Sequence, residues 1–178
     1  MKKKLLVVLV LVLCAAGLGW SQGGAKPLGS VTFELGGSVV APIGVGAEFF
    51  LGHLGLGAEF RFLFLVMEGA MVAPIEPGAA VRFYFSDLDS SLFLMGGVSY
   101  LTAFYAGGGE SGTAPFGFLK PKAGVGYSAL FGKGNKTRFL VELGVVYLWP
   151  VVEGSLITTE DVFFPFLPHF MIGFGRAF

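Results

Sequence analysis

Residues 54–64 read Leu-Gly-Leu-Gly-Ala-Glu-Phe-Arg-Phe-Leu-Phe. Apolar side chains occupy the even-numbered positions of this stretch, whereas glycine, Glu59 and Arg61 occupy the odd-numbered positions up to 61. A period of two is the pattern of a β-strand whose two faces meet different surroundings. The stretch therefore predicts a strand with one apolar face and one face of small and charged residues.

The same alternation recurs along the chain and predicts eight strands joined alternately by short and longer connections. The predicted strands cover residues 31–39, 43–49, 54–64, 79–85, 92–104, 119–131, 139–149 and 170–178. The alternation is weakest in the fifth strand, 92–104. The longer connections are predicted as loops at 67–75, 106–115 and 150–162. Turn-forming residues predict tight connections near 52–53, 86–90 and 132–136.

The composition indicates a membrane as the surrounding solvent. The chain has 178 residues, of which 54% are hydrophobic and only 13% charged, with 29 glycines and 20 phenylalanines. Soluble domains carry about 25% charged residues. The 12 basic residues balance the 12 acidic residues, so no footprint of nucleic-acid binding is visible.

Strands rather than helices are expected to cross this membrane. A spanning helix needs about 20 apolar residues, and the one long uncharged run, 90–109, is interrupted by glycines. Strands in lipid must close into a barrel because every backbone group needs a partner. Eight strands of about 9–13 residues match the smallest common bacterial outer-membrane barrels.

A soluble eight-stranded barrel of the lipocalin type is the competing fold. It would turn the charged parity toward water, yet that parity is rich in glycine and holds only about one charge per strand, too little for a soluble exterior. The sequence therefore predicts an all-β protein, an eight-stranded antiparallel transmembrane β-barrel with its apolar parity facing lipid.

The first 21 residues are predicted to be a cleaved signal peptide. Lys2–Lys4 form a basic start, Leu5–Leu13 an apolar run of nine residues, and small residues follow. We favour cleavage after Ser21, with cleavage after Gly17 or Gly19 as close alternatives. An uncleaved anchor is the other interpretation, but the apolar run is short for a span. The predicted domains are thus a signal peptide, 1–21, and a barrel, 22–178.

Cys14 is the single cysteine, so no intramolecular disulfide is expected. A lipoprotein would carry its lipid at this residue. Leu13 does not suit that interpretation, because lipoprotein signals have Gly, Ala or Ser before the cysteine. Cys14 is therefore expected to leave with the signal peptide.

The last predicted strand carries a resemblance. Phe170, Ile172, Phe174 and the terminal Phe178 alternate, while Arg176 departs from the pattern at a position where its side chain can reach the headgroups. With the signal peptide and the eight strands, this ending resembles the small OmpA/OmpX-type outer-membrane barrels, without identifying one member. The resemblance implies a bacterial outer-membrane location, contact with outer-membrane lipid, and recognition of these four residues by the barrel-assembly machinery.

The parity that faces inward gives the candidate site. Its charged members should pair, since an unpaired buried charge costs several kcal/mol, and an eight-stranded interior is just filled by side chains. We expect a salt-bridged cluster that fills the lumen, with a gated polar path for small solutes as the alternative. The cluster comprises Glu34, Glu48, Glu59, Arg61, Arg82, Glu142, Lys120 and Lys122. The Gly-x-Gly repeats are expected to be small lumen-facing residues, because no helix follows them as a phosphate loop requires.

Catalysis is not predicted. A nucleophilic serine needs a base within reach and a group that orients the base. His53 lies in a predicted turn, and His169 has no serine two positions later. No cysteine and histidine cluster suits a metal, so catalytic, cofactor and metal residues are all assigned as none. A lipid-modifying enzyme remains a remote alternative.

Aromatic residues are predicted to mark both membrane interfaces. Those at the extracellular strand ends are Tyr100, Tyr105, Tyr147 and Trp149, and those at the periplasmic ends are Phe50, Phe83, Phe85, Phe131 and Phe178. The charged residues of the predicted exposed loops are all acidic, which favours a cation or a basic partner: Glu68, Glu76, Glu110, Glu153, Glu160 and Asp161. The expected function is a structural or surface-interaction barrel, ahead of a narrow channel for small or apolar solutes; the oligomeric state stays open.

Overall fold

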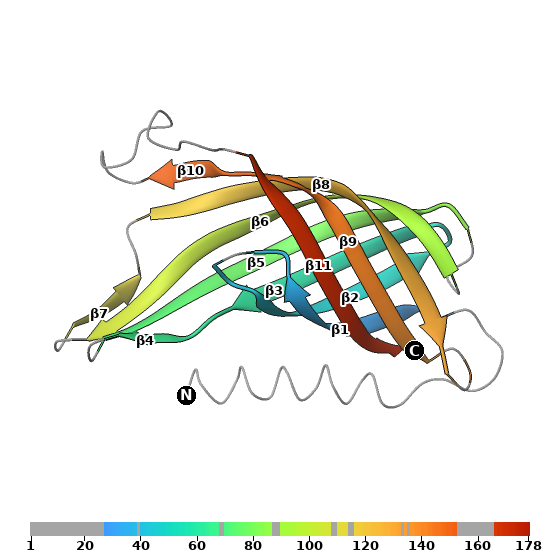
Figure 1. Cartoon of the computed structure of the whole chain (residues 1–178), viewed down its shortest axis with the longest axis horizontal. Coiled ribbons are helices and arrows are strands. Elements are labelled where there is room, and N and C mark those ends of the chain that lie inside the picture. Colours follow the sequence, from blue (N-terminus) through green and yellow to red (C-terminus); the bar gives the residue numbers. More distant parts are fainter. Residues whose placement is uncertain are drawn as a thin grey trace.

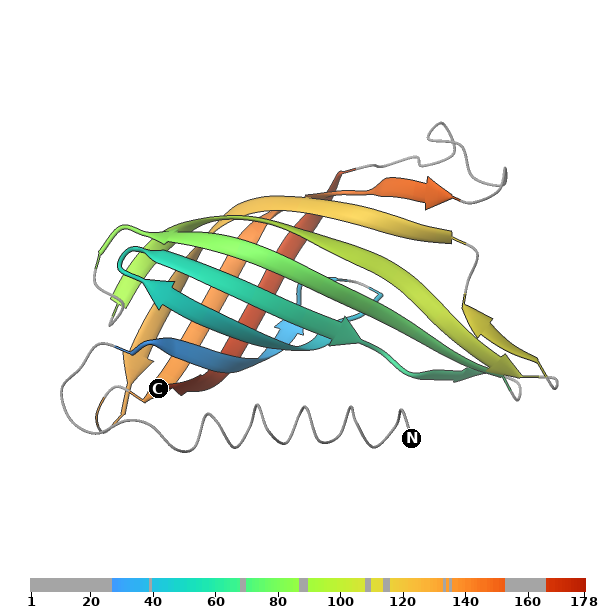
Figure 2. The ribbon, with the colours of Figure 1, turned by 180° about the vertical axis from the view of Figure 1, so that it is seen from behind.

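The structure, a computed structural model, is a barrel of antiparallel strands (Figures 1 and 2). It describes residues 27–38, 40–67, 70–86, 90–107, 110–113, 116–132, 134, 136–152 and 166–178. The predicted signal peptide and Cys14 lie outside these residues. Within the described ranges, no helix has the length and apolar character needed to cross a membrane.

Eight strands close the barrel wall in the order β1, β2, β3, β5, β6, β8, β9 and β11, with β11 pairing back onto β1. All neighbours are antiparallel, which confirms the predicted fold class. The wall strands are β1 (Gly29–Gly36), β2 (Ile43–Leu51), β3 (Leu54–Phe62), β5 (Ala70–Tyr84), β6 (Ser90–Gly107), β8 (Phe116–Phe131), β9 (Thr137–Tyr147) and β11 (Phe166–Ala177).

Three short strands lengthen this wall at one end. β4 (Leu65–Met67) continues β3 along β5, and the amide of Leu63 bridges the two by donating to Pro74 O at 3.1 Å. β10 (Trp149–Val152) continues β9 along β8, and β7 (Glu110–Thr113) folds back on the end of β6. The barrel is therefore taller along β5 and β6 than along the short β1–β2 hairpin (Figure 1).

Several predicted boundaries were wrong. The predicted loop 67–75 belongs largely to β5, which starts at Ala70 and tolerates Pro74 because that residue only accepts through its carbonyl. β7 lies within the predicted loop 106–115, and β10 begins the predicted loop 150–162, whose remainder is outside the described residues. The first strand ends at Gly36 because Gly36 and Gly37 take left-handed φ values of 93° and 77°.

Both described termini lie at the same end of the barrel (Figure 1). Leu28 donates its amide to Phe178 O at 2.7 Å, which joins the start of β1 to the end of β11. The β2–β3, β5–β6 and β8–β9 turns lie at this end as well. We refer to this end, which holds both described termini, as the terminal end and to the other as the loop end. In outer-membrane barrels the short turns lie on the periplasmic side.

Candidate functional site

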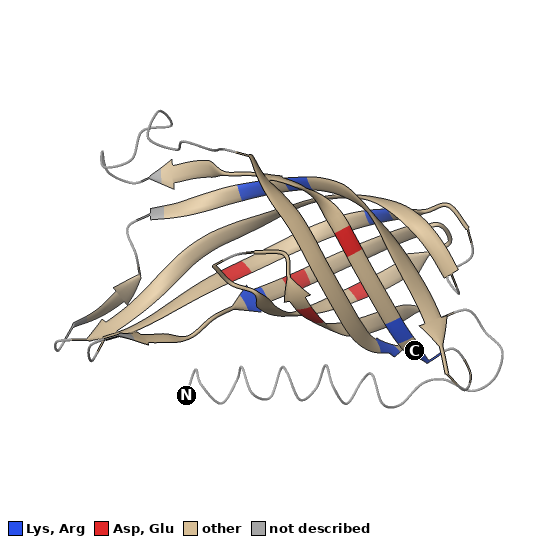
Figure 3. Ribbon diagram, viewed as in Figure 1, with Lys and Arg blue, Asp and Glu red and all other residues tan. Residues whose placement is uncertain are grey.

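The alternation of each strand divides the side chains between the outer face and the lumen. All eight residues of the predicted interior cluster are inside, and none is more than 6% exposed. Figure 3 shows the charged positions gathered around the middle of the barrel and near the terminal end, whereas β4 and β10 carry no charged residue. The eight side chains of the predicted cluster are therefore shielded from solvent.

One group of contacts lies toward the terminal end. Arg82 on β5 binds Glu142 on β9 at 2.6 Å and Glu48 on β2 at 3.2 Å. Arg138 on β9 binds the same Glu48 at 2.6 Å, and Tyr84 donates to Glu48 Oε1 at 2.8 Å. Glu48 thus receives two guanidinium groups and one hydroxyl, which compensates its removal from water.

Arg138 is also held by side chains on three other strands. It donates to Ser30 Oγ at 2.5 Å, to Ser128 Oγ at 3.0 Å and to the hydroxyl of Tyr84. Every member of this group is more than nine-tenths buried. The arginine therefore links β1, β8 and β5 through fully buried hydrogen bonds.

A second group of contacts lies toward the loop end. Arg61 on β3 binds Glu34 on β1 at 2.9 Å and also contacts Glu59, which in turn binds Lys122 on β8. This chain of ion pairs crosses the lumen from β1 to β8. It joins strands on opposite sides of the barrel, so the pairs hold the two walls together.

Lys120 also belongs to this group, and its partner is Glu76, which the sequence analysis had placed in an exposed loop. Lys120 Nζ lies 2.7 Å from Glu76 Oε2, and Ser99 donates to Glu76 Oε1 at 2.7 Å. The prediction that Glu76 is an exposed loop residue was wrong, since it is buried within β5. Its neighbours Pro74 and Pro77 made the segment resemble a loop, although its parity matches Arg82.

The interior charges stay balanced when Glu76 and Arg138 are added to the predicted set, which already holds four residues of each sign. Arg138 was left out of the predicted cluster because the predicted strand began one residue later, at Phe139. Arg138 has the same parity as Glu142, and this parity places its side chain in the lumen. The five basic residues are Arg61, Arg82, Lys120, Lys122 and Arg138, and the five acidic residues are Glu34, Glu48, Glu59, Glu76 and Glu142. Equal numbers allow each charge a partner of opposite sign.

An apolar layer that the sequence interpretation missed lies beside the first group, at the terminal end. Phe50 contacts Tyr84 edge to face at a centroid separation of 5.9 Å, and Tyr84 contacts Phe93 at 5.2 Å. The guanidinium of Arg138 lies 4.9 Å from the ring centre of Phe50. The buried apolar layer comprises Phe50, Tyr84, Phe93, Met95, Leu130, Leu140, Met171 and Ala177.

Phe50 therefore does not belong to the predicted periplasmic aromatic set, because its ring points into the lumen. Phe83, Phe85 and Phe131 do lie exposed at the terminal end of their strands. At the loop end, Tyr100, Tyr105 and Trp149 are exposed as predicted. The two sets remain candidates for the two membrane interfaces.

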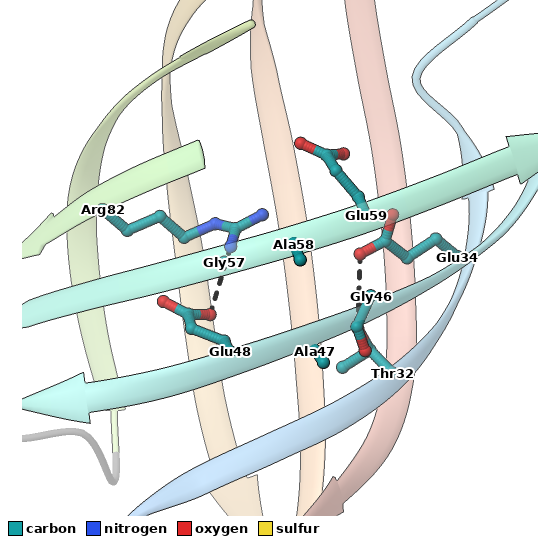
Figure 4. A pocket seen from close by; sticks show the side chains of 9 residues that line it. All are labelled: Thr32, Glu34, Gly46, Ala47, Glu48, Gly57, Ala58, Glu59 and Arg82. Carbon is teal, nitrogen blue, oxygen red and sulfur yellow. Dashed lines mark hydrogen bonds and ion pairs between the residues drawn. The ribbon is translucent and has the colours of Figure 1, made fainter. Parts of the chain in front are cut away.

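Glycines on the inward parity make room for the large side chains. A Cβ on Gly57 would lie 2.9 Å from Arg82 Nη1, and one on Gly55 would overlap the Glu48 carboxylate. Figure 4 shows Glu34, Glu48, Glu59 and Arg82 around a recess beside Gly46 and Gly57, bridged by the Arg82–Glu48 bond. The recess has no room for a water molecule. This fits the expectation that the repeated glycines are packing residues.

The two histidines have different surroundings. His53 Nδ1 lies 2.8 Å from Tyr84 O in the turn after β2. His169 is 2% exposed, with Nε2 3.1 Å from Glu142 Oε2 and Nδ1 3.2 Å from Gly37 O. Among the described residues, no group of three acidic, histidine or cysteine side chains is suited to a metal ion.

Comparison with known proteins identifies the fold. No protein-family model and no curated protein matches the chain. Neisserial surface protein A (NspA) matches with 11% identity and a TM-score of 0.53 over 84% of this chain and 93% of its own. The chain has the fold of a small eight-stranded β-barrel.

Two further solved structures match at TM-scores below 0.5. Ail, the attachment invasion locus protein of Yersinia pestis, has 13% identity and a TM-score of 0.44, covering 86% of this chain and 100% of its own. Acinetobacter baumannii CarO2 has 12% identity and a TM-score of 0.45, covering 88% of this chain and 100% of its own.

Proposed function

We propose that this chain is an integral bacterial outer-membrane β-barrel with a closed lumen and a structural or surface-interaction role, without enzymatic activity. The observation that carries the proposal is an arrangement opposite to that of soluble proteins. The balanced charges are buried in the lumen, and the apolar parity is exposed on the outer face. Lipid is the solvent that suits this arrangement. A water-facing barrel of lipocalin type would bury the apolar parity instead.

The outer face supports a location in lipid along the whole circuit of the wall. Exposed apolar residues occur on every wall strand, including Phe33 on β1, Val45 on β2, Leu94 on β6 and Leu143 on β9. Contiguous apolar surface of this extent is rare on soluble monomers. Outer-membrane lipid is therefore the proposed partner of this face.

The closed lumen is supported by two successive layers. The ion pairs connect opposite walls through the middle of the barrel, and the apolar layer around Phe50 and Phe93 follows toward the terminal end. An ion crossing the lumen would have to separate paired charges and then pass a layer that offers few polar groups. Both steps oppose conduction.

Planar-bilayer recording tests the closed lumen. We expect the purified wild-type barrel to show no steady openings. Phe93→Ala should leak because it removes a ring from the apolar layer, whereas Leu92→Ala, the matched change on the outer face of the same strand, should stay silent. Steady ion-selective openings of the wild type would contradict the closed lumen and favour the narrow channel.

A surface role is supported by the uneven height of the wall. β5 and β6, with 15 and 18 residues, are longer than the roughly 9–11 residues that a spanning strand needs. Exposed Phe104 and Tyr105 lie on the part of β6 that pairs with β7. The neighbour NspA is by name a surface protein. The acidic residues Glu153, Glu160 and Asp161, proposed to favour a cation or basic partner, lie outside the described residues.

The proposal that the protein is not an enzyme rests on the surroundings of its two histidines. A serine nucleophile needs a free ring nitrogen as its base. His169 has both nitrogens within hydrogen-bond distance of Glu142 and Gly37, and His53 contacts a backbone carbonyl. His169 therefore has no free ring nitrogen to act as a base, and none of the hydrogen bonds given for the described residues joins His53 to a serine; we assign no cofactor.

The barrel-assembly machinery is the proposed partner of the last strand. Phe170 and Phe174 are more than half exposed on the outer face of β11. Phe178→Ala, which keeps the backbone hydrogen bonds of this residue to Leu28 and Gly29, should lower the amount of barrel assembled in the outer membrane of producing cells while leaving refolding of the purified chain in detergent unchanged, as heat-modifiable gel migration would show. Equal loss in both settings would mean that Phe178 acts through stability alone.

A further inference from the structure

One charged side chain points outward from the barrel wall. Among the described residues of the eight wall strands, the outward parity is uncharged except for Arg176, which lies exposed near the end of β11. Arg61, Arg82 and Arg138 each bind a buried glutamate inside the lumen. The side chain of Arg176 forms no ion pair or hydrogen bond with any residue that the structure describes. Its partner is therefore to be sought outside the barrel.

The register of the sheet places Arg176 at the expected membrane interface. Arg176 lies opposite Thr137 on β9, and Thr137 lies opposite Phe131 on β8. Phe131 is exposed and belongs to the aromatic set proposed for the interface at the terminal end. One row across the outer face thus joins an arginine, a threonine and an interfacial aromatic ring. At that depth a guanidinium can leave the hydrocarbon and reach the lipid headgroups.

Thr137 supplies a second polar group beside Arg176. Directly opposite residues of antiparallel strands have their Cβ atoms about 5 Å apart on the same face. Within the described part of the chain, the hydroxyl of Thr137 has no hydrogen-bond partner. Gly132 leaves space next to this hydroxyl, since a Cβ on Gly132 would lie 3.4 Å from Thr137 Oγ1. A guanidinium and a hydroxyl are therefore both available to one ligand.

The surroundings of these two residues are apolar. Phe174, two positions before Arg176, is exposed on the outer face and packs on Phe139 with a distance of 4.9 Å between the ring centres. On the other side of Arg176, Val31 of β1 lies opposite it. Acyl chains suit such a surface. An anionic group that is attached to acyl chains therefore fits both the polar pair and its surroundings.

Phosphate is the anion that suits an arginine next to a hydroxyl. The planar guanidinium donates two parallel hydrogen bonds to two phosphate oxygens, which leaves a third oxygen for the hydroxyl. A carboxylate has only two oxygens, and the guanidinium would take both. A glycerophospholipid carries its phosphate at the interface and its acyl chains in the hydrocarbon, so it matches the site better than a fatty acid does.

We propose that Arg176 and Thr137 form a binding site for the phosphate group of a glycerophospholipid in the leaflet at the terminal end, with the acyl chains lying along Phe174 and Phe139. The proposal rests on the proposed location of the outer face in lipid, and it names the lipid chemistry that this part of the face recognises. A contact between exposed charged groups adds little to folding stability, so the site is measured by binding rather than by unfolding.

Titration of the full barrel in octyl glucoside micelles tests the site, because the headgroup of this detergent has neither phosphate nor charge. We expect dihexanoylphosphatidylglycerol to cause a saturable shift of the Arg176 Nε–H signal and of the Thr137 amide signal in NMR spectra. Dihexanoylglycerol, which has the same chains without the phosphate, should leave both signals in place, as should inorganic phosphate at the same concentration. An equal shift with dihexanoylglycerol would overturn the proposal in favour of a purely apolar surface, and an equal shift with inorganic phosphate would overturn it in favour of a site for free phosphate.

Variants assign the binding to its residues, with the Thr137 or Val31 amide as the reporter. Arg176→Gln should weaken the affinity for dihexanoylphosphatidylglycerol by about tenfold or more, the size expected for losing hydrogen bonds between charged groups. Arg176→Lys should weaken it less, because the charge remains without the planar fork. Thr137→Val should weaken it roughly fivefold, the size expected for one hydrogen bond.

Tyr127→Phe is the matched control for Thr137→Val. It removes another hydroxyl of the outer face, whose partner Ser90 Oγ lies 2.7 Å away, and it should bind the lipid like the wild type. Unchanged affinity in Arg176→Gln would overturn the proposal, as would equal losses in Thr137→Val and Tyr127→Phe. The titration of the wild type is decisive even where a variant does not fold.

A spin label separates failure of the site from failure of the proposed location in lipid. A neutral lipid that is spin-labelled near the end of its acyl chain should broaden the amide signal of Leu143, near the middle of β9, if the outer face contacts hydrocarbon. Broadening at Leu143 together with an unshifted Arg176 signal would refute the phosphate site alone. An unbroadened Leu143 signal would refute the location in lipid on which the site depends.

Discussion

Arg82→Met should lower the free energy of unfolding by about 3–5 kcal/mol, the cost of removing one partner from a buried ion pair. Methionine roughly keeps the length of the side chain, so the loss is one of charge and hydrogen bonds more than of packing. Arg82 serves two carboxylates, those of Glu48 and Glu142. Urea unfolding in lipid vesicles, followed by tryptophan fluorescence and gel migration, measures the change.

The two carboxylates are affected unequally. Glu48 keeps Arg138 at 2.6 Å and the hydroxyl of Tyr84, whereas Glu142 keeps His169 alone among the residues that the structure describes. Most of the loss should therefore come from Glu142, which stays buried at 0% exposure. Adding Glu142→Met should recover part of the stability, because replacing both partners of a buried pair is much less costly than removing one.

Arg176→Met is the matched control, since Arg176 lies exposed at the terminal end of β11. Its effect should stay within about 0.5 kcal/mol, as for surface substitutions generally. A loss at Arg82 no larger than that at Arg176 would mean that the lumen is wet enough to solvate Glu142. A double variant less stable than Arg82→Met alone would show that the pair is not the main interaction of Glu142.

The parity of the strands was enough to predict the wall and most of the interior. The sequence of a single strand is enough to assign its side chains to one of two faces, and Glu59, Arg61 and Glu142, which this parity assigns to the lumen, are buried in the structure. The errors occurred where a local signal competed with parity. Pro74 and Pro77 concealed the strand around Glu76, and a boundary set one residue late omitted Arg138.

The apolar layer and the contacts of the β1–β2 connection depend on information that the sequence pattern does not contain. Phe50 shares the inward parity of Glu48, but Phe49 and Leu51 on the other parity are also apolar, so the local pattern no longer separates an apolar face from a polar one at this point. Phe50 is inside because Tyr84 and Arg138, distant in sequence, lie beside it. Likewise, the contacts of Gly37 with Arg61 and His169 follow from the closure of the barrel rather than from any local motif.

Leu143→Arg should be among the most damaging single changes on the outer face if that face contacts lipid. Leu143 is 53% exposed and lies near the middle of β9, where the apolar band of a spanning barrel is centred. An arginine on the lipid face costs about 2–4 kcal/mol at the bilayer midplane and about 0–1 kcal/mol near the interfaces. Refolding into vesicles and urea titration measure this cost.

The cost of an outward-facing arginine depends on its depth in the bilayer, and this dependence distinguishes a membrane barrel from a soluble one. Phe131→Arg makes a comparable change on an exposed residue at the terminal end of β8, so it should cost no more than about 1 kcal/mol. In a barrel whose outer face met water, both arginines would be tolerated and Leu143→Arg would improve solubility without detergent. Equal, small costs at the two positions would therefore refute the proposed location, whereas a cost that grows toward the middle of the strand requires a hydrocarbon layer around the barrel.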